Sequence, residues 1–390
     1  MNKYINTLNS KYILIGIFIL FNLLFVLPRL AVMSFPPDEL VVDYRTLQYF
    51  FSYNLEFMKR GLIGTLFDIF NIQPTLKTIW ILSLLFSNIV FFLIYNYLKI
   101  VFKDLQNSST WIIVFLFLFT ISPATVWNFG YEAGRADLLN LAIELLIVII
   151  IICNNNKFHF MIPILLGLGM LSHEAFLFMS IPIIIALLFD RFTRNRAYIP
   201  TIISSFIVIF CVVLAIIMYG KINSLNFESL YMSAYQKPLP GNLPTINTFM
   251  IVTSSLSTNI LFTLREYFTL HVWKSLILAL PLLASYLYLY VKPVKFLSLP
   301  VEKKVLFLSP FLIFPLFLLG VDIYRWFSMM LINMFIVSTY FIYTKMITFS
   351  DYKTKGIKIA LYIIIFYSSL GALGARVSFP YVFMFLDRVL

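Results

Sequence analysis

The sequence predicts an all-α, polytopic integral membrane protein with about eleven transmembrane helices, and three observations lead to this fold class. Hydrophobic residues make up 61% of the chain and charged residues only 12%, which is too little polar surface for a soluble domain of this length. The apolar residues form long, repeated runs rather than the alternation of a membrane-spanning strand. Basic residues concentrate in every second connection, as they do in oriented helical membrane proteins.

The apolar runs extend along the whole chain. The first is interpreted as a retained membrane helix, because "PRLAVMSFPP" follows it instead of the small-residue cleavage site of a signal peptide. The Ser/Thr-rich stretch 248–263 is interpreted as a re-entrant or a spanning segment. The predicted spans are 12–33, 75–98, 111–129, 138–153, 158–171, 175–189, 199–219, 273–291, 305–321, 326–344 and 358–374.

The charge distribution orients these helices. With the N-terminus in the cytoplasm, the predicted inner side holds 16 of the 29 basic residues and four of the 17 acidic residues. The whole net charge of +12 therefore lies inside. We expect one integral membrane domain, 1–390, with two long outer loops, 34–73 and 220–272.

The same distribution excludes other classes. The positive charge follows topology and forms no patch, so no nucleic-acid partner is predicted. Cys153 and Cys211 both lie in apolar runs, and their spacing predicts neither a disulfide framework nor a metal site.

The first outer loop opens with the stretch "SFPPDELVVDYR". Ser34 before two prolines is typical of a helix start, where Asp38 and Glu39 would complement the helix dipole. Glu39 and Asp43 are four residues apart and repel on one helix face unless a cation compensates. Arg45 is close enough in sequence to do so.

Farther along this loop, a second short helix is expected after Asn54. Its Glu56 and Arg60 would form an i,i+4 ion pair of structural origin. The following "KRGLIG" predicts either close helix packing or a close approach of the backbone to a phosphate.

Two shorter outer connections are also charged. The connection "YEAGRADLLN" carries Glu132, Arg135 and Asp137 within six residues, more charge than a simple connector needs. The alternative to a functional role is a turn whose charges satisfy one another. In "GMLSHEAFLFMS", His173 and Glu174 interrupt an apolar stretch whose two arms are short for a membrane core of about 30 Å. We expect the pair to line a water-filled, outward-facing recess; the alternative is a buried pair that caps helices.

Further cations reach the outer side through other connections. These residues are Arg265, Arg325 and Arg376. For each, the alternative is a solvated charge or one that faces lipid headgroups.

These features resemble the multi-pass C-type (GT-C) glycosyltransferases. The resemblance rests on a first helix that leads into a long outer loop of short helices, on the "PPDE" at its start, and on the short, charged second connection with "EAGRAD". It covers about the first 190 residues. The Ile/Phe/Asn/Lys-rich composition is similar to that of polymerases and side-branch transferases of bacterial surface-polysaccharide synthesis.

The resemblance implies a glycosyltransferase of the bacterial inner membrane, with its active site facing outward. It would transfer a sugar from a polyprenyl-phosphate-linked donor, by an inverting mechanism, onto an acceptor glycan such as O-antigen. Asp38 matches the catalytic-acid position and Asp43 is second in line. The predicted phosphate- or substrate-binding residues are Arg45, Arg60, Glu132, Arg135, Asp137, His173, Glu174, Arg265, Arg325 and Arg376. No metal ligands are assigned, and a divalent metal cofactor is left open.

The main alternative is a flippase or transporter of lipid-linked oligosaccharides. Transporters place polar residues near the bilayer midplane and show repeats and broken helices. Most polar residues here lie at one face, but Glu144 lies well inside a predicted helix and is typical of that class. An outer-face acyl or phosphoryl transferase with His173 as its base is a third class.

Overall fold

The computed structural model describes residues 2–32, 47–54, 56–220, 256–267 and 270–373. The chain forms two compact units, and each is built from separated segments. Unit 1 consists of Met1–Val32, Asn88–Tyr131 and Ile260–Leu390, and unit 2 consists of Met33–Ser87 and Glu132–Asn259. The chain therefore passes from unit 1 to unit 2 and back twice.

Unit 1 is all-helical in its described part. Its helices, including the second half of α3 and most of α13, are α1 (Asn2–Val32), α3 (Leu76–Val101), α4 (Ser108–Ile121), α5 (Val126–Tyr131), α13 (Leu256–Tyr267), α14 (Leu270–Val291), α15 (Val301–Leu308), η6 (Ser309–Ile313), α16 (Leu316–Leu319), α17 (Ile323–Tyr343) and α18 (Lys355–Ser368). Short 3₁₀ turns, η5 (Phe296–Ser298) and η7 (Phe349–Tyr352), connect some of them.

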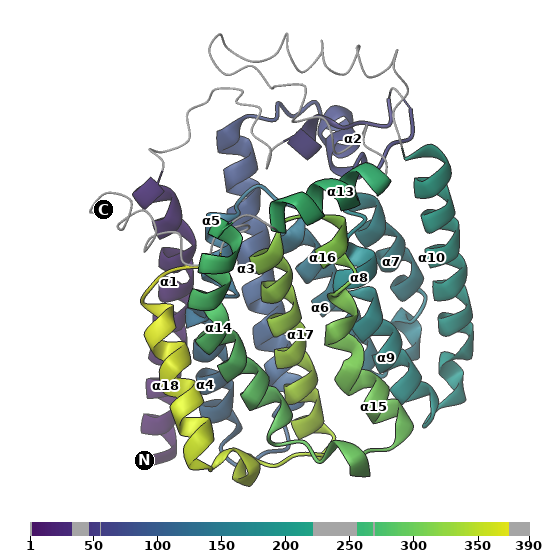
Figure 1. The fold of residues 1–390 in the computed structure, drawn as a ribbon. Helices are drawn as coiled ribbons and strands as arrows, with labels where there is room; N and C mark the ends of the chain where they lie inside the picture. The colour runs from purple at the N-terminus through teal and green to yellow at the C-terminus, as the bar shows by residue number, and fades with distance from the viewer. Residues whose placement is uncertain (1, 33–46, 55, 221–255, 268–269, 374–390) are drawn as a thin grey trace. The chain divides into compact units, whose positions relative to one another are not determined.

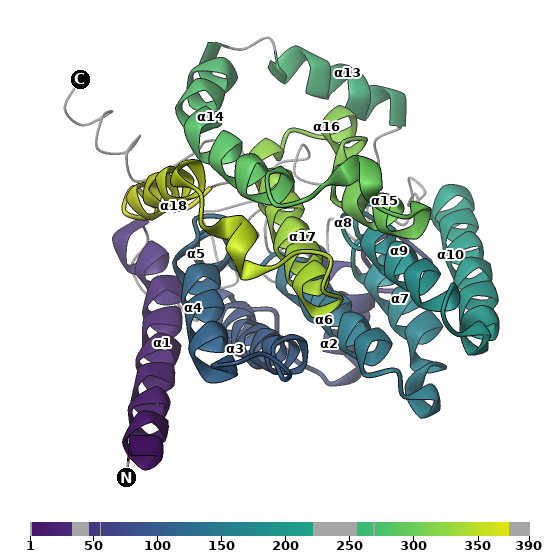
Figure 2. The ribbon, with the colours of Figure 1, turned by 90° about the horizontal axis from the view of Figure 1, so that it is seen from below.

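Close helix packing organises unit 1. Helix α1 packs on α4 and α5, and a methyl group on Gly130 would overlap the carbonyl of Phe25, so a glycine allows the two backbones to approach. Helices α14 and α18 also pack side by side (Figures 1 and 2). Tyr97 fixes α3 to α17, because its hydroxyl donates to the carbonyl of Ile336 at 2.7 Å.

Unit 2 is also helical in its described part. Its elements, with the first half of α3, are η1 (Leu47–Phe50), α2 (Leu62–Ile69), α6 (Asp137–Cys153), η2 (Asn156–Phe158), α7 (Met161–Ser172), α8 (Phe176–Met179), α9 (Ile181–Phe192), η3 (Arg196–Tyr198) and α10 (Ile199–Tyr219). Helix α7 packs on α6, α10 and α2, and α9 packs on α6 and α8; Figure 1 shows α7 and α10 side by side.

Prolines interrupt several of the predicted spans. The predicted helix 111–129 is divided between α4 and α5 around Pro123, and the predicted helix 305–321 between α15, η6 and α16 around Pro310 and Pro315. Proline lacks the backbone N–H of a continuous helix and clashes with the preceding turn. The predicted helix 175–189 is broken at Ser180, directly before the Pro182-containing start of α9.

The membrane character follows from helix length and composition. Five helical stretches in the described part of the chain are long and apolar enough to cross a membrane: Ser10–Pro28, Leu76–Val101, Ser108–Tyr131, Arg196–Tyr219 and Ile323–Tyr343. No β-strand occurs in the described residues. The predicted all-helical class is confirmed for the described residues, and the five helices are consistent with a helical membrane protein. The number of eleven spans stays a prediction.

The predicted orientation can be tested by cysteine labelling at exposed positions. We expect a membrane-impermeant maleimide to label Gln73→Cys in intact cells, and to label Lys103→Cys and Arg194→Cys only after the membrane is opened, because the basic connections are predicted to face inward. The native thiols Cys153 and Cys211 are exposed, so the variants are made in a background with serine at both positions. Labelling of position 194 but not of position 73 in intact cells would overturn the orientation.

Candidate functional site

Three connections of unit 2 converge at one end of its helices. Gln48 donates from Nε2 to the carbonyl of Gly134 at 2.9 Å, which ties η1 to the α5–α6 connection. Arg60 binds Glu174 between α7 and α8. The start of α6 meets the end of α7 through Ser172, whose hydroxyl donates to Asn140 Oδ1 at 2.6 Å. The charged segments singled out in the sequence therefore meet, although they are far apart along the chain.

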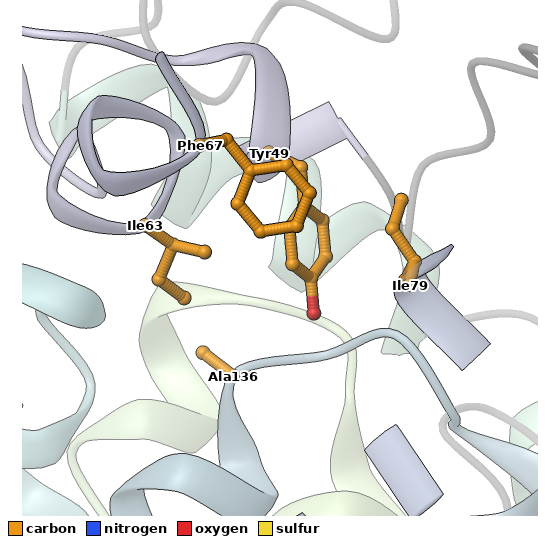
Figure 3. Close-up of a cluster of buried hydrophobic side chains, with 5 residues drawn as sticks. All are labelled: Tyr49, Ile63, Phe67, Ile79 and Ala136. Atoms are coloured by element: carbon orange, nitrogen blue, oxygen red, sulfur yellow. The ribbon is translucent and has the colours of Figure 1, made fainter. Parts of the chain in front are cut away.

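An apolar cluster joins the same segments of unit 2. The rings of Tyr49 and Phe67 meet edge to face with centroids 5.2 Å apart, and Ile63, Ile79 and Ala136 complete the cluster (Figure 3). The five residues come from η1, α2, α3 and the connection before α6. Because these apolar side chains are removed from water, their burial stabilises the packing of η1 and α2 against the connection before α6.

Two glycines let the first outer loop fold onto itself. A methyl group on Gly64 would overlap the backbone carbonyl of Phe51, and one on Gly61 would overlap the ring of Tyr53. Tyr53 also donates its backbone N–H to the Thr65 hydroxyl at 2.8 Å. This confirms close packing as the reason for the glycines in "KRGLIG".

Gly64→Ala is expected to destabilise the protein by about 1–3 kcal/mol, the usual range for an added methylene in a packed site. The matched control is Gly16→Ala on α1, where an added methyl group meets no atom within 4 Å. Thermal unfolding of both variants in detergent is the measurement. Equal midpoints for the two variants would contradict the close approach of α2 to residue 51.

The Arg60–Glu174 pair is the most specific contact of the site. Nε and Nη2 of Arg60 donate to the two carboxylate oxygens at 2.8 and 2.5 Å, across 114 residues of sequence. The side chains are 16% and 30% exposed, so the pair is largely buried but reachable from solvent. Bidentate pairs of this kind fix orientation as well as charge.

Arg60 also has an unusual backbone. Its φ is 66°, in the left-handed region, which costs an L-residue with a side chain roughly 1–2 kcal/mol. Such strain persists where the surroundings determine the conformation, and it clusters at functional sites. The prediction that the second short helix includes residues 56–60 is wrong, because α2 begins only at Leu62.

Glu174 is held ionised by its neighbours. Burial raises the pKa of its carboxyl group, but the Arg60 guanidinium, His173 and Lys59 lower it by more, so the pKa lies well below its ordinary value. The backbone N–H of Lys59 donates to the carbonyl of Gly220 at the end of α10. Lys59 was not among the predicted site residues, although it stands next to Arg60 in the sequence.

His173 has a different role from the predicted one. It is 3% exposed, and its Nδ1 accepts the backbone N–H of Ala175 at 3.1 Å. The ring thus caps the turn that leads into α8, which is the helix-capping alternative. Only Glu174 of the two residues presents a partly exposed side chain.

The second connection is buried and ion-paired. Arg135 Nε lies 2.5 Å from Glu132 Oε2, and their side chains are 9% and 4% exposed. Asp137 is 2% exposed and occupies the first turn of α6, where a carboxylate complements the helix dipole. All three predicted site residues of this connection are therefore buried or nearly so.

Of the remaining predicted site residues, two lie in the described part of unit 1 and four lie outside the described residues. In unit 1, Arg325 is buried and donates to Asp322 at 2.9 Å, so it acts in a local ion pair. Arg265 is exposed on α13. The predicted residues Asp38, Asp43, Arg45 and Arg376 lie outside the described residues.

Comparison with known proteins adds no relative. No family model, curated protein or solved structure matches this chain.

Proposed function

We propose that the chain is a glycosyltransferase of the bacterial inner membrane. It would use a polyprenyl-phosphate-linked sugar or oligosaccharide as its donor, on the outer face, and extend or decorate a surface polysaccharide such as O-antigen. The observation that carries the proposal is the Arg60–Glu174 pair: a largely buried, solvent-reachable guanidinium in a strained backbone, oriented by a carboxylate from another connection.

The reaction requires two things of the protein, a base and a set of fixed cations. The acceptor hydroxyl attacks the anomeric carbon, the bond from that carbon to the phosphate oxygen breaks, and its electron pair leaves with the phosphate. A carboxylate takes the hydroxyl proton. Fixed cations stabilise the charge that develops on the departing phosphate.

Unit 2 supplies the fixed cation. The contact with Glu174 fixes the Arg60 guanidinium through Nε and Nη2, and this guanidinium is the proposed contact of the donor phosphate. Lys59 is close enough to Glu174 to lower its pKa and would add a second positive charge. Asp38, in "PPDE", remains the proposed base.

A flippase of lipid-linked oligosaccharides is the second candidate. It is favoured by Glu144, which is fully buried within α6, as ionisable residues of transport pathways are. Such a protein would move the donor across the bilayer and leave the glycosidic bond intact.

One reconstitution experiment separates the two. The full-length protein is placed in proteoliposomes with a polyprenyl-phosphate-linked sugar and an acceptor glycan. We expect the acceptor to gain sugar and the lipid carrier to be released. If the donor changes leaflet while its sugar–phosphate bond stays intact, the transferase proposal fails and the flippase replaces it.

A further inference from the structure

Helix α6 carries a row of buried polar side chains that the proposed transfer reaction does not use. Asp137, Asn140 and Glu144 are spaced i, i+3 and i+7, so they share one face of the helix. Asn140 and Glu144 are both fully buried. Two hydroxyl groups from the neighbouring segments bind this face: Ser172 contacts Asn140, and Ser180 contacts Glu144.

The hydrogen bonds around these side chains do not balance. Ser180 donates to Glu144 Oε2 at 2.6 Å, while Glu144 Oε1 has no hydrogen-bond partner among the described residues. Ser172 has one hydroxyl proton, yet two acceptors lie within bonding distance, Asn140 Oδ1 at 2.6 Å and the Gly169 carbonyl at 2.8 Å. Asn140 Nδ2 also has no partner among the described residues; with its amide reversed it would donate to Ser172 Oγ, and the Ser172 proton would go to Gly169. The Glu144 Oε1 atom stays without a partner in either arrangement.

The backbone is interrupted beside both contacts. Helix α7 ends at Ser172, directly before the extended backbone of His173. Ser180 stands between α8 and α9 with non-helical angles. In membrane proteins, such interruptions opposite a buried carboxylate are where protons and small cations are bound.

The carboxyl group of Glu144 is isolated from other charges on the packed helices. No ionisable residue occurs in α7, or in α9 before Asp190. The ionisable groups on the surrounding elements stand at the ends: His173 and Glu174 after α7, Asp190 and Arg191 near the end of α9. An ionised carboxylate without a charged partner is strongly disfavoured in such surroundings.

We infer that Glu144 is a buried, exchangeable proton site, in which the carboxyl group bonded to Ser180 takes up and releases one proton. Asn140 and Asp137 lie on the same face of α6, between Glu144 and the end of the helix where the three connections meet. The inference does not depend on glycosyl transfer, because it concerns a group outside the Arg60–Glu174 pair.

Dicyclohexylcarbodiimide, an apolar reagent that modifies protonated carboxyl groups in membranes, tests this on the full-length wild-type protein. Mass spectrometry should find its adduct on Glu144 at acid and neutral pH, with loss of the adduct as the pH rises. Asp190 is the internal control: it is fully buried in the same unit but lies 3.6 Å from Arg194, so we expect no adduct there.

A substitution at Ser180 tests whether its hydrogen bond controls the protonation of Glu144. Ser180→Ala removes a hydrogen bond that favours the ionised form, so the pH of half-maximal labelling should move upward by about one unit or more. An unmodified Glu144 peptide at every pH would overturn the inference. Protection of Glu144 by Na⁺ but not by choline at constant pH would also overturn it, in favour of a sodium site.

Discussion

Replacing Asp38 with asparagine is expected to slow glycosyl transfer about 10²- to 10⁴-fold, the usual contribution of a general base. Asparagine keeps the size and polarity of the side chain but cannot accept the acceptor's proton. The residue follows two prolines at the opening of the first outer loop, the position that the family resemblance gives to a catalytic acid. Binding of the donor should change little, because its phosphate is assigned to cations.

Two measurements on purified protein in nanodiscs decide this prediction: the rate of sugar transfer and the affinity for the donor. Glu39→Gln is the matched control, since it removes the adjacent carboxylate, whose proposed role is to complement a helix dipole. Transfer by Asp38→Asn at nearly the wild-type rate would remove Asp38 as the base and move the assignment to Asp43.

Arg60→Lys should also reduce transfer strongly, by about 10²- to 10³-fold, the range seen when one donor to a developing negative charge is lost. Lysine keeps the charge but cannot make the two-pronged contact that fixes the guanidinium on Glu174. Donor binding should weaken as well, because the phosphate loses a charge-assisted contact. Arg194→Lys, a half-exposed arginine outside the site, is the control for the same chemical change.

A double-mutant cycle then shows whether Arg60 and Glu174 act as a unit. Glu174→Gln should itself impair transfer, and the two substitutions together should cost less than the sum of their separate effects. If the effects add, Glu174 does not orient Arg60 for the reaction. Thermal unfolding of the same variants separates a loss of activity from a loss of folded protein.

Hydropathy predicted the helices well because a helix forms from hydrogen bonds within one continuous stretch of sequence. Every predicted span contains helix in the structure, since a long apolar run can satisfy its backbone in a membrane only within itself. The interruptions at Pro123 and Ser180 were missed because a run can stay apolar across them. Their signals, Pro123 itself and the Ser180–Pro182 stretch, are visible in the sequence.

The site was predicted less completely because its contacts are not local. The charged connections could be recognised from their composition, but the pairing of Arg60 with Glu174 spans 114 residues and leaves no pattern in a single sequence. The i,i+4 rule instead suggested Glu56 as the partner, but the rule applies only within a helix, and residues 56–60 are not helical. A similar local rule does hold at Arg325, which pairs with Asp322 three residues before it.

The interleaving of the two units sets an order on how the chain can fold as it is synthesised. Unit 2 has all of its segments once Asn259 has been made, whereas the first two segments of unit 1 must wait for Ile260–Leu390. Helices α1, α4 and α5 already pack on one another, so this early part of unit 1 can form before its last helices are inserted. Apolar surface that α14 and α17 later cover would meanwhile face lipid or an insertion factor, which makes the interval before their arrival the stage most open to misassembly.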